Sequence, residues 1–151
     1  MDDPYNLARF VTAQNDNGRY DQALSQFDEA LSQLLRGRKT SHWMWFIFPQ
    51  FAGLGQSSRS RHFAIASIDE ARAYVEHAVL GPRLLACAAA LASDDSPTAE
   101  EIFCGIDTQK LRSSLTLFMQ AVPDQPIFAQ LLDRHFSGAT DSVTEELIKS
   151  H

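Results

Sequence analysis

The segment from Ala30 to Ile68 has the composition of an anion-binding site, because it carries five cationic residues and no Asp or Glu. The chain as a whole has a formal net charge of −6, so charge is segregated along the sequence. Glycines let backbone N–H groups approach an anion, and a hydroxyl or a guanidinium can donate to it. The candidate anion-binding residues of this segment are Arg38, Lys39, Gly53, Gly55, Ser57, Arg59 and Arg61.

The run SHWMWFIFPQ, from Ser41 to Gln50, lies inside this segment and holds both tryptophans of the chain. Either Trp43 or Trp45 could stack on a nucleobase or on another flat ring. In the alternative, both indoles belong to the core, the glycines only turn the chain, and Arg59 and Arg61 are solvated. The sequence leaves both interpretations open.

His42 and Asp107 are the candidate catalytic residues, as proton carriers in the hydrolysis of a nucleotide or sugar-phosphate bond. Histidine is the side chain that changes charge near neutral pH without perturbation. In the alternative, His42 is a hydrogen-bonded core residue and Asp107 caps a helix. Three further ligand-binding candidates, Lys110, Ser113 and Ser114, share one face of that predicted helix and could complete the pocket. Otherwise they are ordinary polar surface residues.

Several other kinds of site are not predicted. No HExxH motif, Cys/His cluster or carboxylate pair at helical spacing indicates a metal, and no cofactor is expected. The GLG at Gly53 does not follow a strand, and no GK[ST] or nucleophile-elbow motif is found, so the dinucleotide, P-loop and hydrolase signatures all fail. Cys87 and Cys104 are interpreted as reduced core residues. The acidic chain makes duplex nucleic acid an unexpected partner.

A membrane or secreted protein is not predicted either. No apolar run approaches the roughly 20 residues that span a bilayer. The N-terminus MDDPYNLARF is acidic and lacks the basic and apolar regions of a secretory signal. A cytoplasmic location is therefore expected.

The chain contains many helix signals. Its 151 residues, 44% of them apolar, suit one compact domain. Asp3 and Pro4 predict the start of a first helix. Capping boxes are predicted at Ser67 with Glu70, Thr98 with Glu101, and Ser142 with Glu145. We expect an all-α domain of seven or eight short helices in an irregular, orthogonal bundle, with a loop around residues 51–65 and no strand.

Two similar heptads, YDQALSQ and FDEALSQ, follow one another from Tyr20 to Gln33. Their apolar residues form one stripe at helical spacing, which predicts a single helix from Tyr20 to Leu35. The repeat suggests a local duplication that lengthened this helix. The long stripe permits a helix-mediated homodimer, but packing within a monomer explains it equally well.

Four stretches of the chain together resemble the bacterial DUF1810 family of uncharacterised proteins: Asp3–Gln14, Gly37–Gly55, Tyr74–Leu84 and Leu111–Phe128. The most specific is HWMWFIFPQFAGLG. The resemblance covers nearly the whole chain, 1–151, and implies one all-helical domain without an established reaction. Some members carry a calpastatin-like label, which this chain does not support because such inhibitors are disordered and polar.

We therefore expect a small anionic ligand, a nucleotide or another phosphate-bearing metabolite, at the SHWMW and GLG segment, with or without catalysis. The alternative is a non-catalytic protein-protein interaction module that uses the aromatic segment, because Trp, Met and Arg are enriched at interface hot spots. The two hypotheses differ in one geometric consequence. A ligand site requires His42 and Arg59 to face a common cavity.

Overall fold

The computed structural model describes residues 2–16 and 24–151, and this part of the chain is all-helical, as predicted. It forms ten helices, rather than the seven or eight expected: α1 (Ala8–Asn15), α2 (Gln26–Leu35), α3 (Met44–Ile47), α4 (Ser58–His62), α5 (Ile68–Glu76), α6 (Leu80–Leu91), α7 (Ala99–Phe103), α8 (Ile106–Ala121), α9 (Ile127–Phe136) and α10 (Ser142–Lys149). Helix α4 lies in a segment predicted as loop. A single parallel bridge, between Phe51 and Ile65, joins the two ends of that segment.

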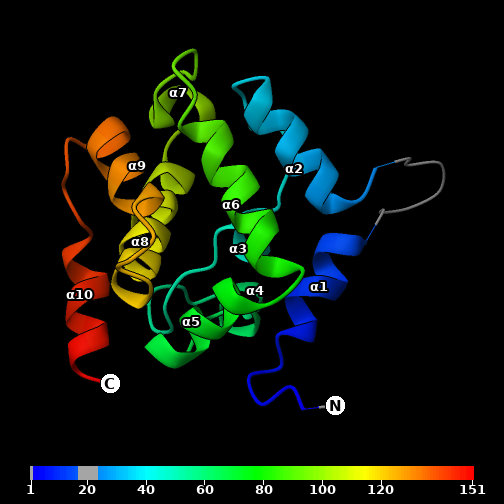
Figure 1. Ribbon diagram of the computed structural model, residues 1–151, viewed down its shortest axis with the longest axis vertical. Helices are drawn as coiled ribbons and strands as arrows, with labels where there is room; N and C mark the ends of the chain where they lie inside the picture. Colours follow the sequence, from blue (N-terminus) through cyan, green and yellow to red (C-terminus); the bar gives the residue numbers. More distant parts are fainter. Residues whose placement is uncertain (1, 17–23) are drawn as a thin grey trace.

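Helix α6 runs through the middle of the molecule, with α2 against one side and α9 against the other (Figure 1). Helix α5 contacts both α6 and α8, and α10 packs on α8. Close packing of α6 depends on its small residues: Cys87 and Ala88 are fully buried, and a Cβ on Gly81 would collide with the carbonyl oxygen of Val75. The glycine is therefore required where α5 turns into α6.

Helix α1 begins at Ala8, four residues later than the Asp3–Pro4 signal would place its first residue. The Asp3 carboxylate still accepts hydrogen bonds from the N–H groups of Leu7 (2.8 Å) and Ala8 (2.9 Å). A turn with Asn6 at a positive φ of 52° separates the carboxylate from the helix that it caps. The Asp3 carboxylate thus bonds the start of the helix, but the predicted N-cap and first turn are wrong, because Leu7 occupies the N-cap position.

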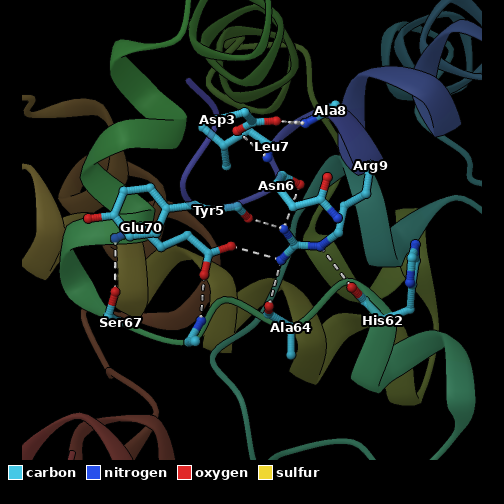
Figure 2. Close-up of polar contacts among 11 residues, drawn as sticks. Asp3, Tyr5, Asn6, Leu7, Ala8, Arg9, His62, Ala64, Ser67 and Glu70 are labelled. Carbon is cyan, nitrogen blue, oxygen red and sulfur yellow. Dashed lines mark hydrogen bonds and ion pairs between the residues drawn. The ribbon is translucent and has the colours of Figure 1, made fainter. Parts of the chain in front are cut away.

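Arg9 fixes α1 to the rest of the fold (Figure 2). Its guanidinium donates to the carbonyl oxygens of Tyr5, Asn6, His62 and Ala64 at 2.6–2.8 Å. It also pairs with the Glu70 carboxylate at 2.7 Å, and both side chains are almost fully buried. A single side chain thus joins α1, the end of α4 and the start of α5.

Helix α2 starts at Gln26, whereas a helix from Tyr20 was predicted. The prediction is wrong for residues 24 and 25, which are not helical. The first four residues of the predicted helix, 20–23, lie outside the described part of the chain. Ser25 caps α2 by accepting from the Asp28 N–H group at 3.1 Å. Ala30 of the second heptad and Leu34, directly after it, are buried in the core, as the predicted stripe requires. Leu35, at the end of the stripe, is 68% exposed.

The predicted capping boxes have three different outcomes. Thr98 and Glu101 form the full reciprocal box at α7. Ser67 caps α5, but the Glu70 carboxylate accepts from the Ala66 N–H group instead of returning to Ser67. At α10 the predicted box is wrong, because the N-cap is Asp141, which accepts from Thr144 N–H at 3.0 Å.

Candidate functional site

Two neighbouring pockets adjoin α3 and the loop before it. The first, which we call the Lys110 pocket, has a volume of about 330 Å³ and is lined by Lys39, His42, Met44, Trp45, Cys104, Ile106, Asp107 and Lys110. The second, the Arg59 pocket, has a volume of about 240 Å³ and is lined by Ala13, Asp16, Gln26, His42, Phe46, Arg59 and Phe63. His42 lines both pockets, so it faces a common cavity with Arg59, as the ligand hypothesis requires.

Trp45 lies close to two cations that come from different helices. The guanidinium carbon of Arg59, on α4, lies 5.1 Å from the centre of an indole ring of Trp45, and the Lys110 ammonium, on α8, lies 5.3 Å from it. Both distances are within the range of a cation–π interaction. The half-buried indole therefore holds two positive groups at the border between the two pockets.

Lys39 and Asp107 form the most buried ion pair of the site, with 2.8 Å between Nζ and Oδ2. Lys39 Nζ also donates to the Ser41 carbonyl oxygen at 2.6 Å. The second carboxylate oxygen of Asp107 lies 3.7 Å from Lys110 Nζ. Asp107 does not cap α8, because Gly105 occupies the N-cap position. Its carboxylate instead lies between two ammonium groups and stabilises both.

The segment from Ala30 to Ile68 contains no carboxylates, but the fold places carboxylates from other parts of the chain against it. Helix α8 places Asp107 against Lys39, and Asp16 lines the Arg59 pocket. The Lys110 pocket nevertheless keeps an excess of positive charge, because its two lysines face one carboxylate. His42 is exposed at the border of both pockets, so its ring nitrogens can contact a ligand in either one.

Trp43, in contrast to Trp45, lies in the core. Its side chain is fully buried, and its indole N–H group donates to Gln33 Oε1 at 2.8 Å. The same oxygen accepts from the Thr40 N–H group at 2.8 Å, while Gln33 Nε2 donates to Ser41 Oγ at 2.8 Å. Trp43 cannot contact a ligand, so its predicted binding role is replaced by a supporting one. The buried Gln33 anchors the loop that carries His42.

The predicted glycine-rich anion loop serves to position α4. Gly53, with a φ of +105°, packs against Leu147 of α10, and Gly55 packs so closely against Ser60 that a Cβ would collide with it. Ser57 is the N-cap of α4 and accepts from Ser60 N–H at 3.1 Å. These three residues line neither of the two pockets at Trp45.

Arg38 and Arg61 also lie away from these pockets. Both side chains are exposed, and within residues 2–16 and 24–151 the Arg61 guanidinium has one hydrogen bond, a long one of 3.4 Å to Gln56 Oε1. Among the predicted anion-binding residues of the segment, the structure brings Lys39, Arg59 and Trp45 together with His42. The other predicted cation of this group, Lys110, comes from the distant helix α8.

A third pocket, the α8–α10 pocket, adjoins the first. It has a volume of about 270 Å³ and is lined by Gln50, Leu54, Gly55, Ile106, Gln109, Lys110, Ser113, Asp141 and Val143. Ser113 Oγ bonds the Gln109 carbonyl oxygen at 3.1 Å and Asp141 Oδ2 at 3.2 Å. Ser114 is fully buried and therefore cannot contact a ligand. The predicted polar face of α8 is thus divided between a pocket and the core.

Cys104 is a lining residue that the sequence interpretation placed in the core. It is exposed, has a positive φ of 56°, and ends α7 directly before Gly105. The neighbouring glycine and the end of the short predicted helix were signals of a turn, and turns lie at the surface. Only Cys87 is buried as expected.

Neither a metal site nor a membrane span is found in the described part of the chain. No group of three or more His, Cys, Asp or Glu residues in residues 2–16 and 24–151 could hold a metal ion. Within the same residues, every helix is too short or too polar to cross a bilayer.

Comparison with known proteins gives a family and a structural relative. A family model described as "Protein of unknown function (DUF1810)" matches residues 4–148. The fold is similar to the crystal structure of the conserved hypothetical protein Rv1873 from Mycobacterium tuberculosis, with a TM-score of 0.89 and 39% sequence identity. That match covers 97% of this chain and 99% of the other. No curated protein matches the chain.

Proposed function

We propose a function from the geometry of the site, because the chain belongs to the DUF1810 family, whose description assigns none. The protein binds a small phosphate-bearing ligand, a nucleotide or another metabolite, beside Trp45. One observation carries this proposal: Arg59 and Lys110, from two different helices, are held near the same half-buried indole, next to pockets that His42 joins.

The cations are suited to an anion by their availability. Arg59 is exposed and forms no ion pair with any residue in the described ranges, so its guanidinium is free to grip phosphate in a bidentate manner. Lys110 is held only loosely by Asp107, at 3.7 Å. A phosphate between these groups would gain charge-assisted hydrogen bonds without having to break a close ion pair.

The walls of the Lys110 pocket suit a flat or apolar part of the same ligand. Met44, Trp45 and Ile106 supply apolar and aromatic surface, and the volume lies near the lower end of the range for small-molecule sites. Aromatic side chains stack on a nucleobase with little preference among the bases. A nucleotide would thus use both the cations and the apolar wall.

Catalysis would depend on His42, since both oxygens of Asp107 face lysine ammonium groups. In a hydrolysis reaction, His42 would move a proton at the ligand, whereas Asp107 would position Lys39 and Lys110. Binding without catalysis requires no proton transfer. Release of inorganic phosphate from a bound phosphate ester, lost in His42→Ala with binding retained, would distinguish an enzyme from a binding protein.

The interaction-module alternative has less support from the exposed surface. Met44, Phe46, Ile47 and Phe48 are buried together with Trp43, which leaves only part of Trp45 for a protein partner. Hot spots of protein interfaces need exposed aromatic anchors. We therefore retain the ligand hypothesis as the one to test first.

Thermal unfolding with inorganic phosphate, AMP, NAD and ADP-ribose tests the proposal. A ligand at one hundred times its Kd should stabilise the native protein by about 2.7 kcal/mol. Arg59→Ala and Lys110→Ala should each reduce the increase in Tm. The matched control is Arg61→Ala, which removes the same charge from the same helix but lies outside both pockets. If none of these anions raises the Tm of the wild type, the proposal fails.

A further inference from the structure

The α8–α10 pocket shares two lining residues, Ile106 and Lys110, with the Lys110 pocket. An anion held by Lys110 therefore has open space on both sides of it. We infer that the α8–α10 pocket binds the hydroxyl-bearing part of the ligand, so that the ligand is a sugar phosphate or a nucleotide bound through its sugar. This inference rests on the proposed anion site, since Lys110 supplies the contact to phosphate.

Two side-chain amides of the α8–α10 pocket, at least partly open to solvent, are available to a hydroxyl ligand. The side-chain amides of Gln50 and Gln109 form no hydrogen bond with any other residue in the described ranges. A carboxamide offers both two N–H donors and a carbonyl acceptor, which matches a hydroxyl group that donates and accepts. Two such groups in one small pocket favour a ligand with several hydroxyls.

Asp141 makes the pocket unsuitable for a second phosphate. Its carboxylate accepts hydrogen bonds from Thr144 N–H (3.0 Å), Thr144 Oγ (2.6 Å) and Ser113 Oγ (3.2 Å). These bonds and the Arg112 guanidinium, 3.7 Å away, hold it as a fixed negative group. A carboxylate repels an anion but accepts a hydrogen bond from a hydroxyl group. The pocket thus selects a neutral polar group beside the phosphate held by Lys110.

Apolar side chains complete the match to a sugar. Leu54 and Val143 line the same pocket, and Val143 is 55% exposed at its edge. A sugar ring presents C–H groups on its faces and hydroxyls around its edge, so a pocket that recognises one needs both apolar and polar walls. The same combination would not favour inorganic phosphate alone.

Isothermal titration of the full chain with ribose 5-phosphate, glucose 6-phosphate, ribose and inorganic phosphate tests this inference. At least one of the sugar phosphates should bind about tenfold more tightly than inorganic phosphate, because two added hydrogen bonds contribute on that order. Gln50→Leu/Gln109→Leu should lower the affinity for that sugar phosphate to the level of inorganic phosphate and leave phosphate binding unchanged. Gln130→Leu, an exposed glutamine of α9 outside this pocket, is the control.

The possible outcomes separate this inference from the proposed function. Equal affinity for inorganic phosphate and both sugar phosphates would overturn the sugar pocket and leave the anion site intact. Binding of none of the four probes, together with no increase in Tm with AMP, NAD or ADP-ribose, would overturn both. Should the double variant fail to fold, Gln109→Leu alone changes an exposed residue, and a loss of about threefold in sugar-phosphate affinity is expected from its single hydrogen bond. An unchanged affinity in that variant would contradict the assignment.

Discussion

Cys104 and Cys87 differ in exposure to solvent, and burial also makes the Cys87 thiol less acidic. Cys104 is exposed in the Lys110 pocket, whereas Cys87 is fully buried in α6 and burial raises the pKa of its thiol to about 12. Because the thiolate is the reactive form, we expect a maleimide at pH 7 to modify one cysteine per native chain and both in denaturant. Mass spectrometry checks the number. Modification of Cys87 in the native protein would contradict this assignment. So would the absence of any modification of an unfolded Cys104→Ser variant, in which Cys87 should react.

Two hydroxyl residues of α8 are both fully buried but differ in their hydrogen bonds. Thr116 Oγ donates to the Arg112 carbonyl oxygen and accepts from Asp141 N–H, whereas Ser114 Oγ has no partner in the described part of the chain. Thr116→Val should cost about 1–3 kcal/mol, because it leaves a backbone N–H group unsatisfied. Ser114→Ala should be neutral or stabilising by up to about 1 kcal/mol, since alanine also favours the helix. Urea unfolding measures both, and equal effects would refute the distinction.

The sequence identified the types of residue in the site better than their positions. His42, Trp45, Arg59 and Lys110 are predicted binding or proton-carrying residues that the fold brings to one place. Nothing in the sequence separates Trp45 from Trp43, because the two indoles are only two residues apart. Trp43 differs from Trp45 because its indole N–H group donates to the buried side chain of Gln33, a residue of another helix.

Helix α1 depends on Arg9 for its connection to α4 and α5. In Figure 2 the guanidinium points at oxygen atoms on several sides, and the side chains of Arg9 and Glu70 are only 10% and 5% exposed. Arg9→Ala should therefore destabilise the protein by about 3–5 kcal/mol, because it leaves a buried carboxylate unpaired. Arg9→Lys should recover only part of this loss, since an ammonium has three donors and lacks the planar fork of a guanidinium.

The midpoint and slope of urea unfolding provide the measurement for Arg9. Arg61→Ala is the control, because Arg61 is an exposed arginine with one long contact and should change stability by less than about 0.5 kcal/mol. If Arg9→Ala and Arg61→Ala had similar effects, the guanidinium would not connect these helices in solution.

Helix ends were predictable where the cap is local and unpredictable where distant residues decide. The Thr98 box needs only residues 98–101, and it forms as the sequence indicates. The Glu70 carboxylate, by contrast, accepts from Ala66 N–H and pairs with Arg9 from α1, which takes it away from Ser67. Helix α1 begins later than predicted for a related reason. The turn at Asn6 directs the carbonyl oxygens of Tyr5 and Asn6 toward Arg9.

Across the whole molecule, folding mixes charges that the sequence separates. The stretch without carboxylates receives Asp107 from α8 in the Lys110 pocket, and Arg9, from the N-terminal region, pairs with Glu70 of α5. Local patterns indicated most of the helices and apolar stripes, because these depend on near neighbours, but they missed α4 and the start of α2. Which charges meet depends on how the helices pack against one another, and that packing cannot be read from local patterns in the sequence.

Stability should fall in two steps as the pH decreases. Burial lowers the pKa of His135 below its ordinary 6.5, against the raising effect of its bond to the Leu91 carbonyl oxygen, and the nearby Arg134 lowers it further. The unfolded chain then binds a proton more readily than the native one, so stability is lost as the pH falls below about 6.5. Protonated Nδ1 would also be a buried donor without a partner among the described residues.

The second step involves three carboxyl groups. Hydrogen bonds to the Leu7 and Ala8 N–H groups lower the pKa of Asp3, and bonds from Thr98 lower that of Glu101. Burial alone would raise the pKa of Asp141, but its hydrogen bonds and Arg112 lower it overall. Stability from such groups is present above their ordinary values of 3.8 and 4.5 and is lost as the pH falls further.

A His135→Gln variant separates the two steps. Glutamine can still donate to the Leu91 carbonyl oxygen but has no proton to gain between pH 6.5 and 5, so the first loss should become smaller while the second, below about pH 4.5, remains. Urea unfolding at pH 7, 6, 5, 4 and 3 measures the free energy of unfolding in both proteins. An identical decrease between pH 7 and 5 in wild type and variant would show that His135 does not cause the first step.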